Sequence, residues 1–333
     1  MKNKILMFVL ICLGIFSATI EAQNFFNKSE PLAYTFSIVA RDTVTGEMGV
    51  AVQSHWFSVG SLVTWGEAGV GVVATQSFVN PAFGTQGLAL LKNGLTPEQA
   101  VQMLTTNDDG RDVRQLAILD GKNPPANYTG AKCIPAAGGI VGKDFAVQAN
   151  LMLNDKVWPA MEKAFTETNG PLAERMVAAL EAAQSVGGDI RGKQSAALLI
   201  VKGKSTGKVW KDRVIDLRVE DDPNPIIELK RILKVHRAYD HMNAGDLAVE
   251  HGYMELAMKE YSTAEKMFPD NLEMKYWHAI TLTNIGQLEK ALPIFKEVFS
   301  KDKNWAILTP RLIGIGQLQV NDNGLKKIME QNK

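Results

Sequence analysis

The sequence predicts an α+β protein in which two helical layers enclose a pair of largely antiparallel sheets, followed by a small all-α domain. Short segments rich in β-branched and apolar residues alternate with pairs of amphipathic segments, in the order sheet, helix pair, sheet strands, helix pair, sheet. Beyond residue 222 the chain changes to helical segments with a regular repeat. We therefore expect an α/β domain over residues 34–222 and a helical-repeat domain over residues 223–333.

The N-terminus has the features of a secretory leader. Two lysines precede a twelve-residue apolar run, residues 5–16, and small and polar residues follow it. The run is shorter than the roughly 20 residues that cross a bilayer as a helix, so cleavage is expected. The prediction is a signal peptide over residues 1–22, a polar lead-in over residues 23–33 and a periplasmic or secreted protein. Lipid attachment at Cys12 is the alternative.

Charge and cysteine content exclude several classes of protein. Loss of the leader removes two lysines and one glutamate, which reduces 36 basic and 36 acidic residues to 34 and 35. Nucleic acid and anionic lipid need a clustered excess of Lys and Arg, so neither is an expected partner. Only Cys133 remains, and one thiol cannot form an internal disulfide. No further apolar run is long enough to span a membrane.

The first strands are predicted close together. Residues 34–40 and 48–53 are rich in β-branched and apolar residues, and the turn-forming residues 42–46 between them predict a β-hairpin. Residues 61–65 and 70–76 have the same character. Four closely spaced strands favour an antiparallel sheet.

Two helix pairs and four strands complete the α/β domain. One helix follows Pro81, and another begins at Thr96, a good N-cap with proline in the next position. The other expected elements are strands at residues 113–119, 145–151, 195–201 and 214–219 and amphipathic helices at residues 157–168 and 171–184.

The tail has the period of a tetratricopeptide-type helix hairpin. Glycine permits the tight turn in such a unit, and alanine allows neighbouring helices to approach. Flanking helices are expected over residues 225–242 and 305–317. Three pairs of residues are 34 positions apart, namely Gly252 and Gly286, Ala257 and Ala291, and Tyr261 and Phe295.

Phosphate-binding and metal-binding motifs are rejected. Residues 187–193 have the glycine and lysine spacing of a phosphate loop, but Gln194 replaces the metal-binding Ser or Thr and a predicted strand follows. Residues 69–74 match a dinucleotide fingerprint but also enter a strand. Only His55 lies in the α/β domain, and the other four histidines have no zinc-helix spacing. We expect no cofactor and no metal.

Several ordered motifs resemble a known family. They are Thr35-Phe-Ser-Ile-Val-Ala-Arg-Asp42, Gly49-Val-Ala-Val-Gln-Ser-His-Trp-Phe-Ser-Val-Gly60, Gly69-Val-Gly-Val-Val-Ala-Thr-Gln-Ser77 and shorter matches at residues 129–133, 148–150 and 188–196. The chain resembles, over residues 34–222, the family catalogued as domain of unknown function 1028 and grouped with the N-terminal-nucleophile (Ntn) hydrolases. The resemblance implies a four-layer αββα sandwich. The tail resembles a domain often attached to this family and thought to bind peptidoglycan.

The resemblance implies a mechanism centred on Thr35. In Ntn hydrolases the nucleophile is the first residue of the mature chain, and its own α-amine is the base. A free α-amine has a pKa of about 7.7 to 8.0, so it can accept a hydroxyl proton near neutral pH. Thr35 would serve as nucleophile and base only after a second cut, between Tyr34 and Thr35. The alternative is that Thr35 only starts an edge strand, where β-branched residues are favoured.

Other polar residues are further candidates. Asn150 could donate to a developing oxyanion or could cap a turn. Ser37 is a second hydroxyl candidate, and Cys133 with His55 is a nucleophile and base alternative. Arg191 could bind a substrate carboxylate or form an ordinary pair with Asp189. The full set is Thr35, Ser37, Ser54, His55 and Asn150 for catalysis, and Gln76, Asn80, Asp189, Arg191 and Gln194 for substrate binding.

These observations predict an exported Ntn-type amidohydrolase that cleaves a peptide or acyl-amide bond. The tail would recruit peptidoglycan or a protein partner. The alternative is a non-catalytic binding or scaffold protein of the cell envelope, which keeps the fold without the chemistry.

Overall fold

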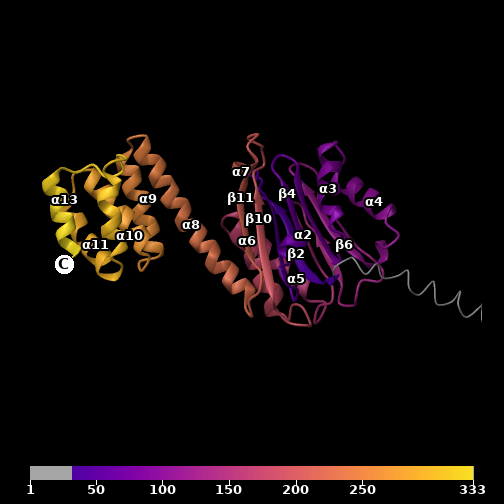
Figure 1. The fold of residues 1–333 in the computed structure, drawn as a ribbon. Helices are drawn as coiled ribbons and strands as arrows, with labels where there is room; N and C mark the ends of the chain where they lie inside the picture. The colour runs from indigo at the N-terminus through magenta and orange to yellow at the C-terminus, as the bar shows by residue number, and fades with distance from the viewer. Residues whose placement is uncertain (1–31, 333) are drawn as a thin grey trace, which may run out of the picture. The chain divides into compact units, whose positions relative to one another are not determined.

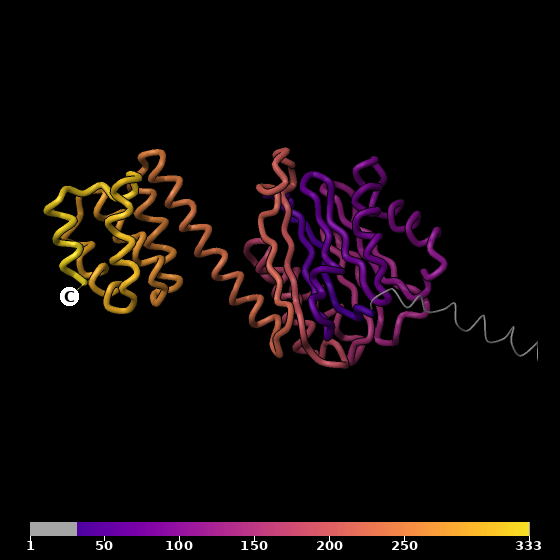
Figure 2. The backbone as a smooth tube through the Cα atoms, viewed as in Figure 1, coloured from indigo at the N-terminus to yellow at the C-terminus, as the bar shows by residue number. Residues whose placement is uncertain are grey.

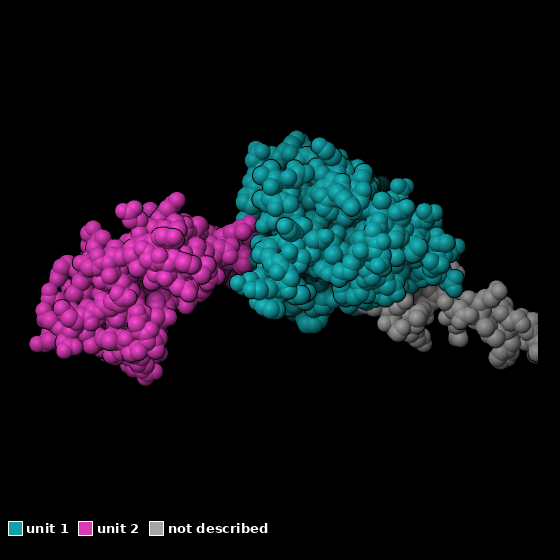
Figure 3. All heavy atoms as spheres, turned by 90° about the horizontal axis from the view of Figure 1, so that it is seen from above, with its two compact units in different colours: residues 1–230 teal, residues 231–333 magenta. Residues whose placement is uncertain are grey.

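The computed structural model of the chain describes residues 32–332. The chain divides into two compact units, residues 1–230 and 231–333, coloured separately in Figure 3. Their boundary lies inside helix α8 (Pro225–Glu250), a few residues beyond the one expected from the sequence. The expected signal peptide and residues 23–31 of the lead-in lie outside the described residues. The last two lead-in residues form strand β1 (Leu32–Ala33).

The first sheet of unit 1 has five antiparallel strands. Their order is β1-β5-β6-β7, and β4 pairs with the same strand, β5, as β1 does. The bounds are β4 Thr64–Glu67, β5 Gly71–Phe78, β6 Arg114–Asp120 and β7 Ala126–Thr129.

The second sheet has six antiparallel strands in the order β11-β10-β3-β2-β9-β8. The predicted hairpin, β2 and β3, lies in the middle of this sheet, as the indigo strands of Figure 2 show. Thr35 is therefore the first residue of a central strand, and the alternative in which it starts an edge strand is wrong on the place of that strand. The bounds are β2 Thr35–Arg41, β3 Met48–Ser54, β8 Gly138–Val141, β9 Phe145–Ala149, β10 Ser195–Val201 and β11 Arg213–Val219.

Helices pack on the outer faces of both sheets (Figure 1). In the first helix pair, α4 begins with the predicted cap, because the Thr96 hydroxyl accepts from Gln99 N and the Gln99 side chain accepts from Thr96 N. This pair buries apolar side chains against β5 and β6. The second pair packs on β2, β3, β8 and β9. The bounds are α3 Ala82–Lys92, α4 Pro97–Thr106, α5 Val157–Glu167 and α6 Leu172–Ser185.

The main core lies between the two sheets. Alternate residues of each strand point inward, and Val39, Val50, Val72 and Leu199 are among the fully or almost fully buried side chains there. The same alternation carries polar side chains into the interior at one end of the sheets, beginning with Thr35. The polar site described below therefore follows from the strand register.

The structure corrects one element and adds several short ones. Residues 61–65, predicted as a strand, are divided between helix α2 (Gly60–Val63) and β4. A tertiary contact accounts for this, because Val59 N donates to the buried Ser195 hydroxyl and fixes the chain where the helix begins. β1, β7 and β8 were missed because each has only two to four residues and little hydrophobic patterning. Helix α7 (Val209–Asp212) and the 3-10 turn Arg111–Val113 are also short.

Unit 2 consists of helices. The turns before α9 and α11 contain Gly252 and Gly286, with φ of 76° and 79°, a conformation that favours glycine. The predicted helix over residues 305–317 ends early, because the 3-10 turn Thr309–Leu312 follows α12. The bounds are α9 Met254–Met267, α10 Leu272–Asn284, α11 Leu288–Lys301, α12 Asn304–Leu308, α13 Asp322–Met329 and a last 3-10 turn, Glu330–Asn332.

The alanines and the aromatic residues that recur 34 positions apart are buried in unit 2. Ala257 and Ala291 are fully buried, and Tyr261 and Phe295 are buried beside them in the two cores of this unit.

Within residues 32–332, no helix combines the length and the apolar character that crossing a membrane requires.

Candidate functional site

Thr35 lies at the start of β2 and is completely buried. Its hydroxyl donates to the Ala33 carbonyl at 2.9 Å. Its own carbonyl accepts from Gln76 Nε2 at 3.2 Å and from Asn150 N at 3.1 Å. Contacts from both sheets therefore fix Thr35 on its C-terminal side, whereas its hydroxyl is engaged by a residue that precedes it.

The peptide bond before Thr35 is held by two side chains. The Tyr34 carbonyl accepts from Ser54 Oγ at 2.5 Å and from Arg191 Nη2 at 2.8 Å. Ser54 is placed there because it pairs directly with Thr35 across the central hairpin. A carbonyl with two convergent donors, one of them cationic, is in an environment that stabilises negative charge on its oxygen.

Asp189 orients Arg191. Arg191 Nε donates to Asp189 Oδ1 at 3.0 Å and Nη2 donates to Oδ2 at 2.7 Å. The Asp189 side chain is fully buried, and it also accepts from the backbone N–H groups of Arg191 and His55. Four donors compensate the buried carboxylate, so the guanidinium is held in one orientation toward Tyr34.

A network of amide and hydroxyl groups joins the two sheets beside Thr35. Ser37 Oγ donates to Gln76 Oε1 at 2.6 Å. Gln76 Nε2 and Asn150 Nδ2 both donate to Gln115 Oε1, each at 2.7 Å, and Gln115 Nε2 donates to Ala149 O at 2.9 Å. Within residues 32–332, Asn150 Oδ1 is buried without a hydrogen-bond partner. It is thus an acceptor available to a donor that residues 32–332 do not provide before any cut.

Strained backbone lies near this network. Leu151, which follows Asn150, has φ of 60°, and Ser77, which follows Gln76, has φ of 73°. Non-glycine residues rarely adopt this backbone conformation, which costs about 1–3 kcal/mol. It persists only where the surrounding structure holds the residue in place. Leu151 is fixed by hydrogen bonds from its N–H to Ile134 O at 3.3 Å and from Ile190 N to its carbonyl at 3.2 Å. The second of these bonds connects the Asn150 loop to the Arg191 loop.

The structure brings together seven of the ten candidate residues, namely Thr35, Ser37, Ser54, Gln76, Asn150, Asp189 and Arg191. The side chains of the other three form no hydrogen bond with these seven within residues 32–332, although Gln194 N donates to the Ser54 carbonyl. The His55 side chain is exposed, and only its backbone N–H contacts Asp189. Asn80 Oδ1 accepts from Ala82 N at the start of α3, and Gln194 Nε2 donates to Asp221 Oδ1.

Cys133 is buried, and its thiol donates to the Arg114 carbonyl at 3.3 Å. Burial raises the pKa of this thiol, which disfavours the thiolate. Since the thiolate is the reactive form, the surroundings do not favour Cys133 as a nucleophile.

Sequence reasoning missed two parts of the site. Gln115 is the acceptor at the centre of the amide network, and Tyr34 presents the carbonyl that Ser54 and Arg191 bind. A signal for Gln115 was available, because Gln76, Gln115 and Gln148 each lie near one end of a largely apolar strand and each is fully buried. The contact to the Tyr34 carbonyl had no sequence signal, because it involves a backbone atom and a distant loop.

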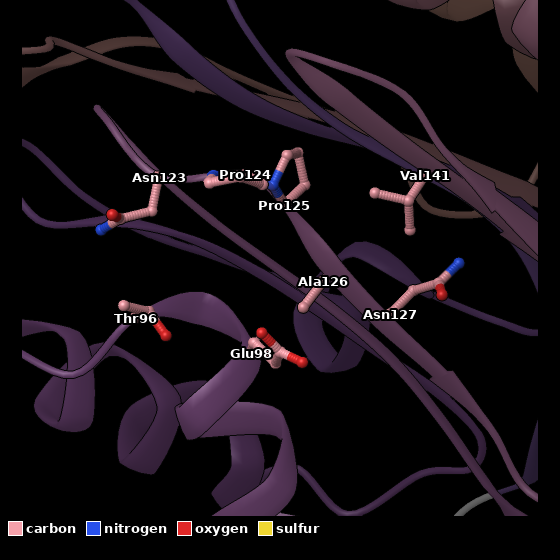
Figure 4. Close-up of a pocket in the computed structure, with 8 residues that line it drawn as sticks. All are labelled: Thr96, Glu98, Asn123, Pro124, Pro125, Ala126, Asn127 and Val141. Atoms are coloured by element: carbon pink, nitrogen blue, oxygen red, sulfur yellow. The ribbon is translucent and has the colours of Figure 1, made fainter.

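A pocket of about 420 Å³ lies elsewhere on unit 1, between the start of α4 and β7 (Figure 4). It includes none of the ten candidate residues. Its lining residues are Thr96, Glu98, Asn123, Pro124, Pro125, Ala126, Asn127 and Val141. Among residues 32–332, no group of three or more His, Cys, Asp or Glu side chains is arranged to hold a metal ion.

Comparison with known proteins identifies the α/β unit. A family model described as a family of unknown function, DUF1028, matches residues 35–229. A crystal structure of a protein from Silicibacter pomeroyi, described with the same family model, is similar with a TM-score of 0.55 and 31% sequence identity over 61% of this chain and 85% of that one. No curated protein matches. Because this family model covers more than half of the residues of the chain, the chain belongs to the DUF1028 family.

Proposed function

We propose that the chain is an exported Ntn-type amidohydrolase that acts on peptide or acyl-amide bonds through Thr35. The observation that carries the proposal is the environment of the Tyr34–Thr35 bond. The carbonyl of this bond accepts from Ser54 and Arg191. Thr35, which supplies the nitrogen of the bond, carries a hydroxyl. The two sheets with helices on their outer faces are consistent with an αββα sandwich of the Ntn type.

The first step of the proposal is cleavage of the Tyr34–Thr35 bond by the chain itself. Thr35 Oγ attacks the Tyr34 carbonyl carbon, and Ser54 Oγ and Arg191 Nη2 stabilise the resulting oxyanion. The carbon–nitrogen bond then breaks, the nitrogen takes the hydroxyl proton, and an ester joins Tyr34 to Thr35 Oγ. Water hydrolyses the ester, which gives a Tyr34 carboxylate and a free Thr35 amine.

The released amine completes the catalytic group. Cleavage separates Ala33, the present acceptor of the Thr35 hydroxyl, so the amine can take over as base. Ser54 and Arg191 then bind the carbonyl of the substrate, and Asn150 Oδ1 is an unpaired acceptor for the new amine. The amide network keeps Ser37, Gln76 and Gln115 as supports of this arrangement.

One observation favours the alternative of a non-catalytic binding or scaffold protein. In the intact chain β1 pairs with β5, with Leu32 opposite Phe78 and Ala33 opposite Ser77. The residues before Thr35 are thus part of a sheet, and a chain that is never cut would keep its site closed. In either case we propose a periplasmic or secreted location, with unit 2 as a tetratricopeptide-like module for peptidoglycan or a protein partner.

Intact mass and N-terminal sequencing of the purified exported protein test the proposal. We expect a chain that begins at Thr35 for the wild type, a slower cut for Thr35→Ser, and no cut for Thr35→Ala with an unchanged circular dichroism spectrum. An uncut wild-type chain that begins at residue 23 would support the binding protein instead. A Thr35→Ala chain cut at the same bond would exclude self-cleavage by Thr35.

A further inference from the structure

The Tyr34 side chain occupies a defined site in unit 1. Tyr34 is only 6% exposed, and its ring packs edge-on against Phe78 with centroids 5.6 Å apart and an interplanar angle of 86°. The Arg191 guanidinium lies over the ring at 5.2 Å from the centroid. An edge-on aromatic pair and a cation over a ring are both contacts that an aliphatic side chain cannot make.

The same side chains hold the Tyr34 ring and the Tyr34 carbonyl. Arg191 lies over the ring and donates to the carbonyl oxygen, and Asp189 fixes its orientation. Phe78 is the last residue of β5, the strand that pairs with the residues preceding Tyr34. The ring site therefore has a fixed position relative to the carbonyl that Thr35 would attack.

We propose that this ring site is the acyl-binding subsite of the mature protein and that it selects amides whose acyl part carries an aromatic side chain. The inference rests on the proposed function. In self-cleavage and in turnover the acyl carbonyl becomes bonded to the same Thr35 oxygen and faces the same two donors. The group attached to that carbonyl must therefore occupy the place that Tyr34 holds in the intact chain, beside Phe78 and Arg191.

Departure of the segment that ends at Tyr34 would leave the subsite empty and suited to an aryl acyl group. Arg191 would then face both the ring and the carboxylate of the product. Burial raises the pKa of the Tyr34 phenol, although the Arg191 charge acts the other way, so the site favours a neutral ring. The ligand class is an aromatic residue, or another aryl acid, on the acyl side of an amide.

A binding experiment on the full chain tests the subsite without requiring any hydrolysis. Tyr34→Gly removes the ring, and p-cresol should raise the Tm of this variant by about 2–4 °C at a concentration several times its Kd. The saturated analogue 4-methylcyclohexanol should give a smaller shift. The uncut variant Thr35→Ala, in which Tyr34 fills the site, and the double variant Tyr34→Gly with Phe78→Ala should show neither shift. An equal shift in all three proteins would overturn the inference.

A second experiment uses self-cleavage and also covers failure of Tyr34→Gly to fold. Full chains with Tyr34→Phe should cleave at the wild-type rate, whereas Tyr34→Leu should cleave about tenfold more slowly. The cleaved protein should prefer N-acetyl-tyrosine p-nitroanilide to the leucine compound by a similar factor. Equal rates for Tyr and Leu would overturn the subsite alone. If the wild type is never cut, the proposed function fails, and the p-cresol experiment still decides the subsite.

Discussion

Asp189 holds Arg191 at two points, with Nε 3.0 Å from Oδ1 and Nη2 2.7 Å from Oδ2. The same Nη2 donates to the Tyr34 carbonyl, so the buried carboxylate determines where the cationic donor of the site points. This relationship makes Asp189 a positioning residue that does not touch the reacting atoms.

Replacing Asp189 with Asn should slow cleavage of the Tyr34–Thr35 bond by about 10- to 100-fold, because loss of the two-point pair releases Arg191 from the carbonyl. Intact mass as a function of time measures the rate. Asp216→Asn is the matched control, since Asp216 likewise pairs with arginine, in its case Arg213 and Arg218, but lies on the exposed part of β11. Equal cleavage rates in the two variants would show that Arg191 keeps its position without the pair with Asp189.

Replacing Gln115 with Leu should destabilise unit 1 by about 2–4 kcal/mol, because the buried donors of Gln76 and Asn150 lose their common acceptor. Calorimetry of the full chain, followed through the transition of unit 1, measures the change. Gln102→Leu on the exposed face of α4 is the control and should change stability by less than about 0.5 kcal/mol. A small effect of Gln115→Leu would mean that the network readily finds other partners.

Cys133 should react slowly with iodoacetamide in the native protein at pH 8 and rapidly in urea, because burial keeps its pKa above the ordinary value. The raised pKa has a defined sign for stability. Below the pKa of the unfolded thiol, about 8.5, both states are protonated, and above it only the unfolded state ionises. The free energy of unfolding should therefore fall as the pH rises through this range. Peptide mapping of the Cys133 peptide measures the labelling, and equal rates with and without urea would contradict the burial.

A chain of residues 223–333 should fold by itself and give a strongly helical circular dichroism spectrum, because it contains all of unit 2 and the whole of α8. A cooperative thermal transition is the expected signature. A fragment of residues 251–333, which lacks α8, is the comparison and should be less stable, since Ala238 and Met242 of α8 are part of a core of this unit. A random-coil spectrum for residues 223–333 would show that unit 2 depends on unit 1.

Most regular elements could be predicted from the sequence because their periodicity is local. The strand at residues 195–201 and the cap at Thr96 are examples, since apolar runs and capping chemistry need no tertiary information. The place of the hairpin in the sheet could not be predicted, because pairing with β9 and β10 depends on residues far along the chain. Residues 61–65 were misassigned for a similar reason, namely the contact between Val59 and Ser195.

The candidate site was predictable in part. The family resemblance indicated Thr35, and polar residues at strand ends indicated Ser54, Gln76 and Asn150. The structure brings the four together because strand register fixes their positions. The role of the Tyr34 carbonyl was not predictable, since a backbone oxygen has no sequence signature. His55 was predicted as a site residue from its place at a strand end, but its side chain is exposed. A strand end fixes where a residue lies but not where its side chain points.

The central position of the β2–β3 hairpin constrains how the chain can fold. Its two outer edges are covered only by β9 and β10, which emerge from the ribosome much later than the hairpin itself. Until residue 201 has been made, these edges present unpaired N–H and C=O groups that could pair with other chains. We expect a slow, late assembly step and a benefit from chaperones that keep the chain extended until these strands have been made.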